Sequence, residues 1–242
     1  QMEKQLAAVL GITTGELDVQ LARSRNDLDA GVFRMVLRRQ LLEVIDRVLA
    51  TGRAALDLAD RYADVLITGY THRRPAQPTT IGHVLAGYAE ALVGEAKAYG
   101  ELLNEMNRSP LGACAFAGTD LPINPARVAE LLGFQELVVN SYEAVAGADH
   151  LVRVATLNAQ ALATGARLAR TLMDWLAWQW VKTPPDFTQG SSIMPQKRNP
   201  VVLEHLVSMA GATAADATCV LTNVGAAWWE DSNNATTDVQ VP

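Results

Sequence analysis

Residues 31–63 read GVFRMVLRRQLLEVIDRVLATGRAALDLADRYA, and this stretch decides the fold class. Charged side chains alternate with apolar ones that recur at steps of three and four residues: Val32, Val36, Leu37, Leu41, Val44, Ile45, Val48 and Leu49. That spacing is typical of an amphipathic α-helix. The stretch therefore predicts a helix over Gly31–Ala63, which is long for a globular protein, with Asp27 or Asp29 as its N-cap.

Further long helices are predicted over Ile81–Asn107, over Tyr142–Val181 and from Pro200 to about Asn223, with a short helix near Ala126–Leu132. No segment of any length shows the two-residue period of a strand. Long helices joined by short loops predict an all-α fold, a long-helix bundle. Small residues on the second helix are expected to let neighbouring helices approach closely: Gly82, Ala86, Gly87, Ala91, Gly94 and Ala98.

The composition excludes several classes of protein. The chain has 242 residues, 49% apolar and 19% charged, and a formal net charge of −6. This is a globular composition, and its acidic balance argues against a nucleic-acid partner. No apolar run approaches the roughly 18 residues that span a membrane, and the first residues do not read as a secretory signal. Two isolated cysteines, Cys114 and Cys219, predict a cytoplasmic protein. The four histidines form no metal-binding pair, so no metal is expected.

Polar residues gather in three clusters next to helix ends. Residues 188–200 (TQGSSIMPQKRNP) form a long loop rich in hydroxyl, amide and cationic groups. Residues 24–27 (SRND) and the pair Thr71-His72 are the other two clusters. Together they suit a site for an anion or a carboxylate at the ends of a bundle. The alternative is that the loop is a solvated connector and that Ser24 and Asp27 only cap the first helix.

Part of the loop at residues 188–200 resembles a known signature. The sequence GSSIMPQKRNP at residues 190–200, with Glu204 four residues beyond it, resembles the signature of the fumarase/aspartase superfamily. Within that superfamily the chain most resembles the argininosuccinate lyase family. The matching stretches are residues 22–27 (ARSRND), 69–80 (GYTHRRPAQPTT) and 111–123. The resemblance covers nearly the whole chain and weakens after about Asn223.

The resemblance implies a fold, an assembly and a reaction. The fold is a central bundle of long helices that forms a homotetramer, with each active site built from three subunits. Residues 24–242 would be most of that central domain, incomplete at its C-terminal end, and residues 1–23 the end of a truncated N-terminal domain. The family uses no metal or organic cofactor. Its members cleave a C–N or C–O bond beta to a carboxylate and release fumarate, so the implied function is a C–N lyase acting on an N-substituted aspartate.

The same resemblance implies roles for individual residues. Ser191 is the catalytic base, an alkoxide whose pKa must be lowered by Lys197 and by the amides of residues 190–194. His72, hydrogen-bonded to Glu204 of a neighbouring chain, supplies positive charge or serves the leaving group. The loop that carries Ser191 is expected to be mobile and to close over the substrate. Residues expected to bind the substrate are Ser24, Arg25, Asn26, Thr71, Ser192, Met194, Lys197 and Asn199.

Departures from the family pattern concern the leaving group. Argininosuccinate lyases usually read Thr-His-Leu-Gln-Pro where residues 71–75 of this chain read THRRP. The Tyr, Gln and Lys that hold the arginine end of the substrate have no counterpart in residues 226–234 (AAWWEDSNN). A second hypothesis is therefore an aminopolycarboxylate (ethylenediamine-disuccinate-like) lyase, which gains support if Arg73 and Arg74 face the site. Two alternatives stay open: an argininosuccinate lyase whose residues 226–234 are misaligned, and a non-catalytic structural protein that keeps the lyase fold.

Overall fold

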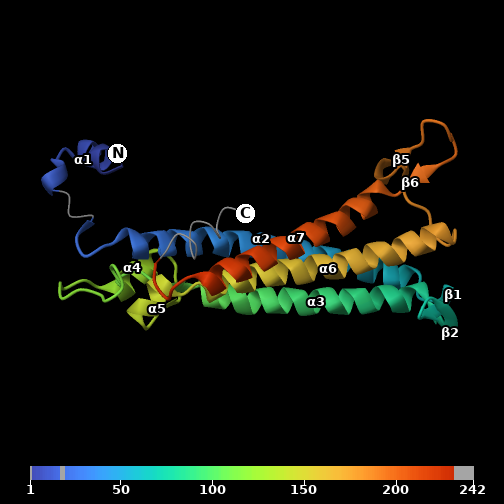
Figure 1. Ribbon diagram of the computed structural model, residues 1–242, viewed down its shortest axis with the longest axis horizontal. Coiled ribbons are helices and arrows are strands. Elements are labelled where there is room, and N and C mark those ends of the chain that lie inside the picture. Colours follow the sequence, from blue (N-terminus) through green and yellow to red (C-terminus); the bar gives the residue numbers. More distant parts are fainter. Residues whose placement is uncertain (1, 17–19, 232–242) are drawn as a thin grey trace. The chain divides into compact units, whose positions relative to one another are not determined.

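The computed structural model of the chain describes residues 2–16 and 20–231, which form two compact units. The first unit holds the residues up to Gln40, Leu103–His150 and the residues from Asn223 on. The second holds Leu41–Leu102 and Leu151–Thr222. Long helices dominate the structure (Figure 1), which confirms the predicted helical fold class.

Four long helices carry most of the structure: α2 (Arg25–Arg61), α3 (Ile81–Met106), α6 (Asp149–Ala177) and α7 (Val201–Ala226). The shorter helical elements are α1 (Met2–Leu10), η1 (Thr14–Glu16), α4 (Pro125–Leu131), α5 (Ser141–Ala146) and η3 (Pro185–Phe187). Among the residues that the structure describes, no helix is both long and apolar enough to cross a lipid bilayer.

The predicted third helix is interrupted near its start, so a single helix over Tyr142–Val181 was wrong. Helix α5 ends at Ala146, and Gly147 has extended backbone (φ −71°, ψ 118°) while its N–H still donates to the carbonyl of Glu143. A Cβ atom on Gly147 would lie 2.7 Å from that carbonyl oxygen, so only glycine fits this exit from the helix. Helix α6 then starts afresh at Asp149.

The start of α2 is capped by Ser24 together with Asp27, as in the alternative interpretation of residues 24–27, and not by Asp27 or Asp29 as the N-cap residue. The hydroxyl of Ser24 accepts the N–H of Asn26 at 3.2 Å. The carboxylate of Asp27 in turn accepts the N–H of Ser24 at 3.1 Å. This reciprocal pair is a capping box, in which two backbone donors that the helix cannot satisfy find side-chain acceptors.

Short strands form three pairs in the described part of the chain, which the expectation of a strand-free chain missed. Strands β1 (Leu66–Thr71) and β2 (Arg74–Thr80) form an antiparallel hairpin. Strands β3 (Arg108–Ser109) and β4 (Glu136–Leu137) pair in parallel, and β5 (Gln189–Gly190) pairs with β6 (Arg198–Asn199) in antiparallel fashion. The hairpin escapes sequence analysis because most of its side chains are exposed on both faces and β2 contains two prolines.

In the second unit, α3 and α6 run antiparallel and are joined by a ladder of polar side chains. The hydroxyls of Tyr88 and Thr171 are 2.8 Å apart, and the buried carboxylate of Glu95 accepts the side-chain amide of Gln160 at 3.0 and 3.1 Å. Farther along, the hydroxyl of Tyr99 donates to the side chain of Asn158 at 2.7 Å, and burial raises the pKa of Tyr99 to about 12. These hydrogen bonds, which satisfy the buried side chains of Glu95 and Tyr99, fix the register of the two helices.

Small residues bring helices together at fewer points than expected. A Cβ atom on Gly82 would lie within 3 Å of the backbone of Ala59 and Ala63, so glycine is required where α3 meets the end of α2. The prediction fails at Gly87 and Gly94, where an added Cβ would meet nothing within 4 Å. The apolar core at this end of the second unit consists of Ala59, Ile81, Leu85 and Trp175.

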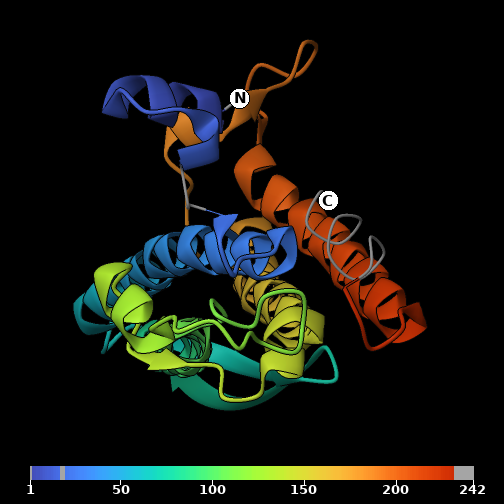
Figure 2. The same ribbon diagram turned by 90° about the vertical axis from the view of Figure 1, so that its left-hand side faces the viewer.

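In the first unit, the short helices α4 and α5 lie near the start of α2 (Figure 2). Two arginines of α2 bond to neighbouring segments. Arg34 is 5% exposed, donates to the carbonyl of Glu105 at 3.3 Å, and has its pKa lowered by burial. Arg38 donates to the carbonyls of Gly133 and Leu132 just beyond α4, at 2.7 and 3.2 Å. A cation at the end of α4 satisfies carbonyls that the helix leaves without partners.

Candidate active site

The loop that carries Ser191 is closed at its base by strands β5 and β6. Gln189 pairs with Asn199, and Gly190 with Arg198. The hydroxyl oxygen of Ser191 accepts the backbone N–H of Met194 at 3.2 Å and that of Ile193 at 3.4 Å. The loop therefore folds its own amides onto the Ser191 oxygen, an arrangement that favours negative charge on that atom.

The other residues predicted in this segment lie around the same loop and the start of α7. Ser192, Met194 and Lys197 are exposed, and Asn199 is half-buried in β6. Glu204 is exposed in the first turn of α7, where its carboxylate suits the positive end of the helix dipole. The polar side chains of this loop therefore remain accessible to a ligand.

Thr71 and His72 lie at the tip of the β1–β2 hairpin, and both are exposed. His72 and Arg73 form a two-residue turn, since Thr71 pairs directly with Arg74. Both turn residues have positive φ angles, 49° for His72 and 62° for Arg73. Positive φ at both central positions is the type I′ hairpin geometry, which usually takes Asn or Gly, so the chain holds a histidine in a strained conformation here.

A cavity of about 390 Å³ lies behind this turn, between the hairpin, the start of α3 and the end of α6. His72, Arg73 and Asp174 line it, together with Tyr70 and Trp178. The rings of Tyr70 and Trp178 are stacked, with centroids 4.6 Å apart and an interplanar angle of 21°. This cavity combines titratable groups with aromatic walls, as ligand sites often do.

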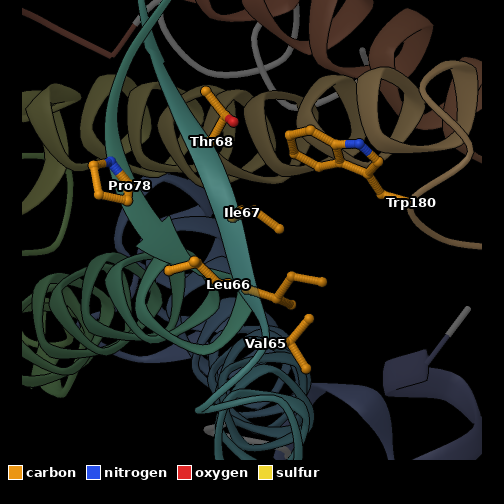
Figure 3. Close-up of a pocket in the computed structure, with 7 residues that line it drawn as sticks. Val65, Leu66, Ile67, Thr68, Pro78 and Trp180 are labelled. Atoms are coloured by element: carbon orange, nitrogen blue, oxygen red, sulfur yellow. The ribbon is translucent and has the colours of Figure 1, made fainter.

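A second cavity, of about 460 Å³, lies on another side of the same hairpin (Figure 3). Figure 3 shows Trp180, from the segment after α6, facing strand β1 across it. The remaining lining is Val65, Leu66, Ile67, Thr68, Pro78 and Ile81. No titratable side chain lines this cavity, so it does not suit acid–base chemistry.

The cluster at residues 24–27 lies in the first unit, where it contacts the stretch 111–123 that the sequence also singled out. The side-chain amide of Asn26 donates to the carbonyl of Ala115 at 3.3 Å. Asp27 is 1% exposed, and its carboxylate accepts the N–H groups of Gly112 and Cys114 at 3.2 and 3.1 Å. Arg25 is exposed, and its Nε atom lies 3.6 Å from the Oδ2 atom of Asp29. The buried carboxylate of Asp27 thus ties the two stretches together, a role that the sequence analysis did not assign to it.

Within the second unit, the predicted residues of the hairpin and those of the Ser191 loop share one end of the helices, but no hydrogen bond or ion pair among the described residues links the two groups. Because α3 and α6 are antiparallel, the hairpin before α3 and the loop after α6 both lie at this end (Figure 1). Among the described residues, no hydrogen bond or ion pair joins His72, Ser191, Lys197 and Glu204 to one another. Each of these side chains is therefore available for a substrate or for another copy of the chain.

Known proteins share the sequence and the fold of this chain. A model of a family described as lyase (Lyase_1) matches residues 1–214. The chain belongs to this lyase family. It is a family of the fumarase/aspartase superfamily, as the motif at residues 190–200 predicted.

Named relatives of this lyase-family chain include argininosuccinate lyases. That of Natronomonas pharaonis is 40% identical over 201 residues, which are 83% of this chain and 41% of the relative. Among solved structures, EDDS lyase in complex with formate superposes with a TM-score of 0.90 at 39% identity, covering 96% of this chain and 47% of that one. A variant of EDDS lyase has been solved with bound fumarate. The class II fumarase of Schistosoma mansoni, at 18% identity and a TM-score of 0.77, shares the fold. The chain spans about half the length of these proteins.

Residues 226–234, where the sequence predicts a departure from argininosuccinate lyases, are described only in part. Residues 226–231 are described, and Trp228 and Trp229 are exposed there. Residues 232–234 of the same segment lie outside the described residues. The departure at residues 71–75 is fully described: Arg73 pairs with Asp174 of α6, whereas Arg74 is exposed and makes no hydrogen bond or ion pair with any described residue.

Proposed function

We propose that the protein is a carbon–nitrogen lyase that eliminates fumarate from an N-substituted aspartate, with Ser191 as the base. The observation that carries this proposal is the loop at residues 190–199, in which two backbone N–H groups point at the Ser191 oxygen. Membership of the lyase family, the argininosuccinate lyases among the relatives and the fumarate-bound EDDS lyase variant support it.

In the first step, a serine acts as a base. Ser191 takes a proton from the carbon alpha to one substrate carboxylate, and the electron pair of the broken C–H bond passes into that carboxylate to give a dianion. The N–H groups of Ile193 and Met194 favour the alkoxide form of Ser191, and Lys197 adds a positive charge on the same loop. Lys197, Asn199 and the residues Ser192 and Met194 are proposed to hold the carboxylate on which the charge develops.

The second step breaks the C–N bond on the neighbouring carbon. The electron pair of that bond leaves with the nitrogen, which gains a proton as the amine departs, and fumarate remains. His72 is proposed to supply the positive charge or the proton for this step, with Glu204 of a neighbouring copy as its partner. Ser24, Arg25, Asn26 and Thr71 are proposed to hold the carboxylates of the succinyl part.

We further propose a homotetramer with shared sites, and helix α7 provides the support. Its 26 residues include only two with a full charge, Glu204 and Asp216, yet its buried residues are only Ala210, Ala217 and Val220. An apolar helix left so exposed is expected to be covered by other copies of the chain. In this assembly, residues 24–242 would correspond to the central helical domain of the longer relatives, and residues 1–23 to the end of the domain before it.

The amine remains the open part of the reaction, and two substrate classes are candidates. Argininosuccinate is supported by the named relatives. An aminopolycarboxylate with a succinyl arm is supported by the likeness to EDDS lyase over 96% of this chain and by the expected departure of residues 226–234 from the argininosuccinate lyase pattern. Arg74 is free to meet additional carboxylates, whereas both terminal nitrogens of Arg73 already bind Asp174.

The decisive experiment mixes the purified full-length protein with fumarate and a panel of amines and follows the absorbance of fumarate. The panel contains arginine, other amino acids, diamines and aminopolycarboxylic acids, and argininosuccinate is assayed in the cleavage direction. We expect addition with one class of amine. Absence of reaction with every amine, together with retained fumarate binding, would favour a non-catalytic binding protein that keeps the lyase fold. Sedimentation of the same preparation tests the tetramer, since an active monomer would contradict the shared site.

A further inference from the structure

The hairpin tip that carries His72 is fixed to helix α6 by an ion pair. The guanidinium of Arg73 donates to both carboxylate oxygens of Asp174, at 2.5 and 2.9 Å. A bidentate pair of this kind fixes the orientation of both groups as well as their separation. Through this pair, the residue directly after His72 is attached to the last turn of a 29-residue helix.

Aromatic contacts reinforce the same attachment on the strand that leads into the turn. Tyr70, two residues before His72, stacks on Trp178, which in turn packs against Trp180 with ring centroids 4.8 Å apart. The chain after α6 is itself ordered by backbone bonds: Trp180 N–H donates to the carbonyl of Trp175 at 2.8 Å, and Gln179 has a φ of 61°. This is a Schellman-type helix end, which sets Trp178 and Trp180 against the hairpin.

The turn needs such an attachment because its own residues disfavour its conformation. His72 and Arg73 both have left-handed φ angles, which cost free energy for any residue with a side chain. A two-residue hairpin on exposed strands has little other packing to hold it. The pKa of Asp174 agrees with a well-formed pair, because the hydrogen bond from Arg73 lowers it below the ordinary aspartate value.

We propose that Asp174 and Arg73 form a clamp that holds the turn and thereby positions His72 for catalysis. Both are positioning residues, and Arg73 is not a ligand of the substrate, because its cation already has a carboxylate partner. An exposed ion pair contributes little to global stability, so the effect is expected in the alignment of His72. Misplacement of a catalytic group by about 1 Å can cost up to about a hundredfold in rate. The inference rests on the proposed lyase function for its kinetic consequence, but not for the clamp itself.

The test is a double-mutant cycle of Arg73→Leu and Asp174→Asn, with Asp64→Asn as the matched control. Asp64 precedes the same hairpin and is exposed, and it makes no hydrogen bond or ion pair with any described residue. If the two residues act as one unit, each single variant lowers kcat by roughly tenfold with little change in KM, and the double variant loses no more than either single one. The control keeps the activity of the unaltered protein.

A second readout keeps the clamp testable if no amine reacts. Amide hydrogen exchange of residues 66–80 should be about threefold faster in Asp174→Asn and in Arg73→Leu than in the unaltered protein or in Asp64→Asn. Unchanged exchange in both variants would overturn the clamp whether or not the protein is a lyase. If amide exchange is faster in both variants but the unaltered protein turns over no substrate, the clamp is supported and the lyase function is rejected. A rise in KM confined to Arg73→Leu would instead make Arg73 a substrate ligand.

Discussion

The turn that carries His72 and the loop that carries Ser191 connect helices at the same end of the second unit, yet they are held in different ways. The turn is attached to helix α6 by the pair Arg73–Asp174 and by the stacked rings of Tyr70 and Trp178. The loop is held by one short strand pair and by bonds among its own backbone atoms and the side chains of Ser191 and Arg198. This difference predicts that the turn proposed to carry the catalytic histidine is fixed in advance, and that the loop proposed to carry the base closes over a substrate.

Replacing the base tests the loop with the largest expected effect. In Ser191→Ala the oxygen that accepts the two amides is lost, and turnover is expected to fall by about 10³-fold, within the range for removal of a general base. The melting temperature should change little, because the lost hydrogen bonds lie in an exposed loop. Ser141→Ala, at the start of α5, is the matched control. A fully active Ser191→Ala variant would remove Ser191 from the role of base.

Replacing His72 should lower the activity without lowering the stability of the protein, because His72 is proposed to act in catalysis but is strained in the turn. Asparagine tolerates a positive φ better than histidine, so His72→Asn should leave the free energy of unfolding unchanged or raise it by a few tenths of a kcal/mol. Turnover should fall by roughly 10- to 100-fold, because the imidazole is lost. Kinetics and urea unfolding measure the two effects, and His72→Gly should show the same division. A variant that loses stability but keeps its activity would show that His72 serves the hairpin and not the reaction.

Fumarate binding should change the loop more than the turn. Closure over the ligand is expected to slow amide exchange of residues 191–197 by severalfold, whereas residues 66–80 should change less because they are already held. Hydrogen exchange measured by mass spectrometry with and without fumarate compares both segments in one experiment. Equal protection of the two segments, or protection of the hairpin alone, would contradict the contrast between a fixed turn and a closing loop.

The sequence predicts the long helices well because their periodicity is local. Helix α2 was expected over Gly31–Ala63 and occupies Arg25–Arg61, and α3 ends one residue before its expected end. The hairpin was missed because its strands have exposed faces and therefore no alternating pattern. The break at Gly147 was missed because a single glycine is tolerated in many helices.

The sequence predicts which residues make up the candidate site but not how they are arranged in space. The motif at residues 190–200 is contiguous, so the sequence reveals it together with the family. The partner of Arg73 lies 101 positions away, and no local pattern marks Asp174 as different from other helix carboxylates. Asp27 was seen as a cap, but its bonds to Gly112 and Cys114 depend on tertiary structure. Contacts over such separations follow from packing, which the periodicity of a single segment does not encode.

Lowering the pH should loosen the attachment of the turn to helix α6 and leave the loop unchanged. This is the smallest of the expected effects. Arg73 lowers the pKa of Asp174 below its ordinary value of 3.8, so the carboxylate is favoured in the folded protein. The contribution of the pair is then fully present above pH 3.8, and it is lost as the pH falls through the lower pKa of the folded state. After correction for intrinsic rates, amide exchange of residues 66–80 should be constant from pH 7 to 4 and rise by at most about threefold below that, since the pair is exposed.

The matched comparison for this acid effect is Asp174→Asn, in which the faster exchange should be present at every pH and the step below pH 4 should be absent. Residues 191–197 should show no such step in either protein, because no carboxylate among the described residues bonds to that loop. Circular dichroism at each pH verifies that the helices stay folded, so that local opening of the hairpin is distinguished from global unfolding. If a step below pH 4 persists in Asp174→Asn, another titratable group causes it. The acid response of the hairpin would then not be due to the Arg73–Asp174 pair.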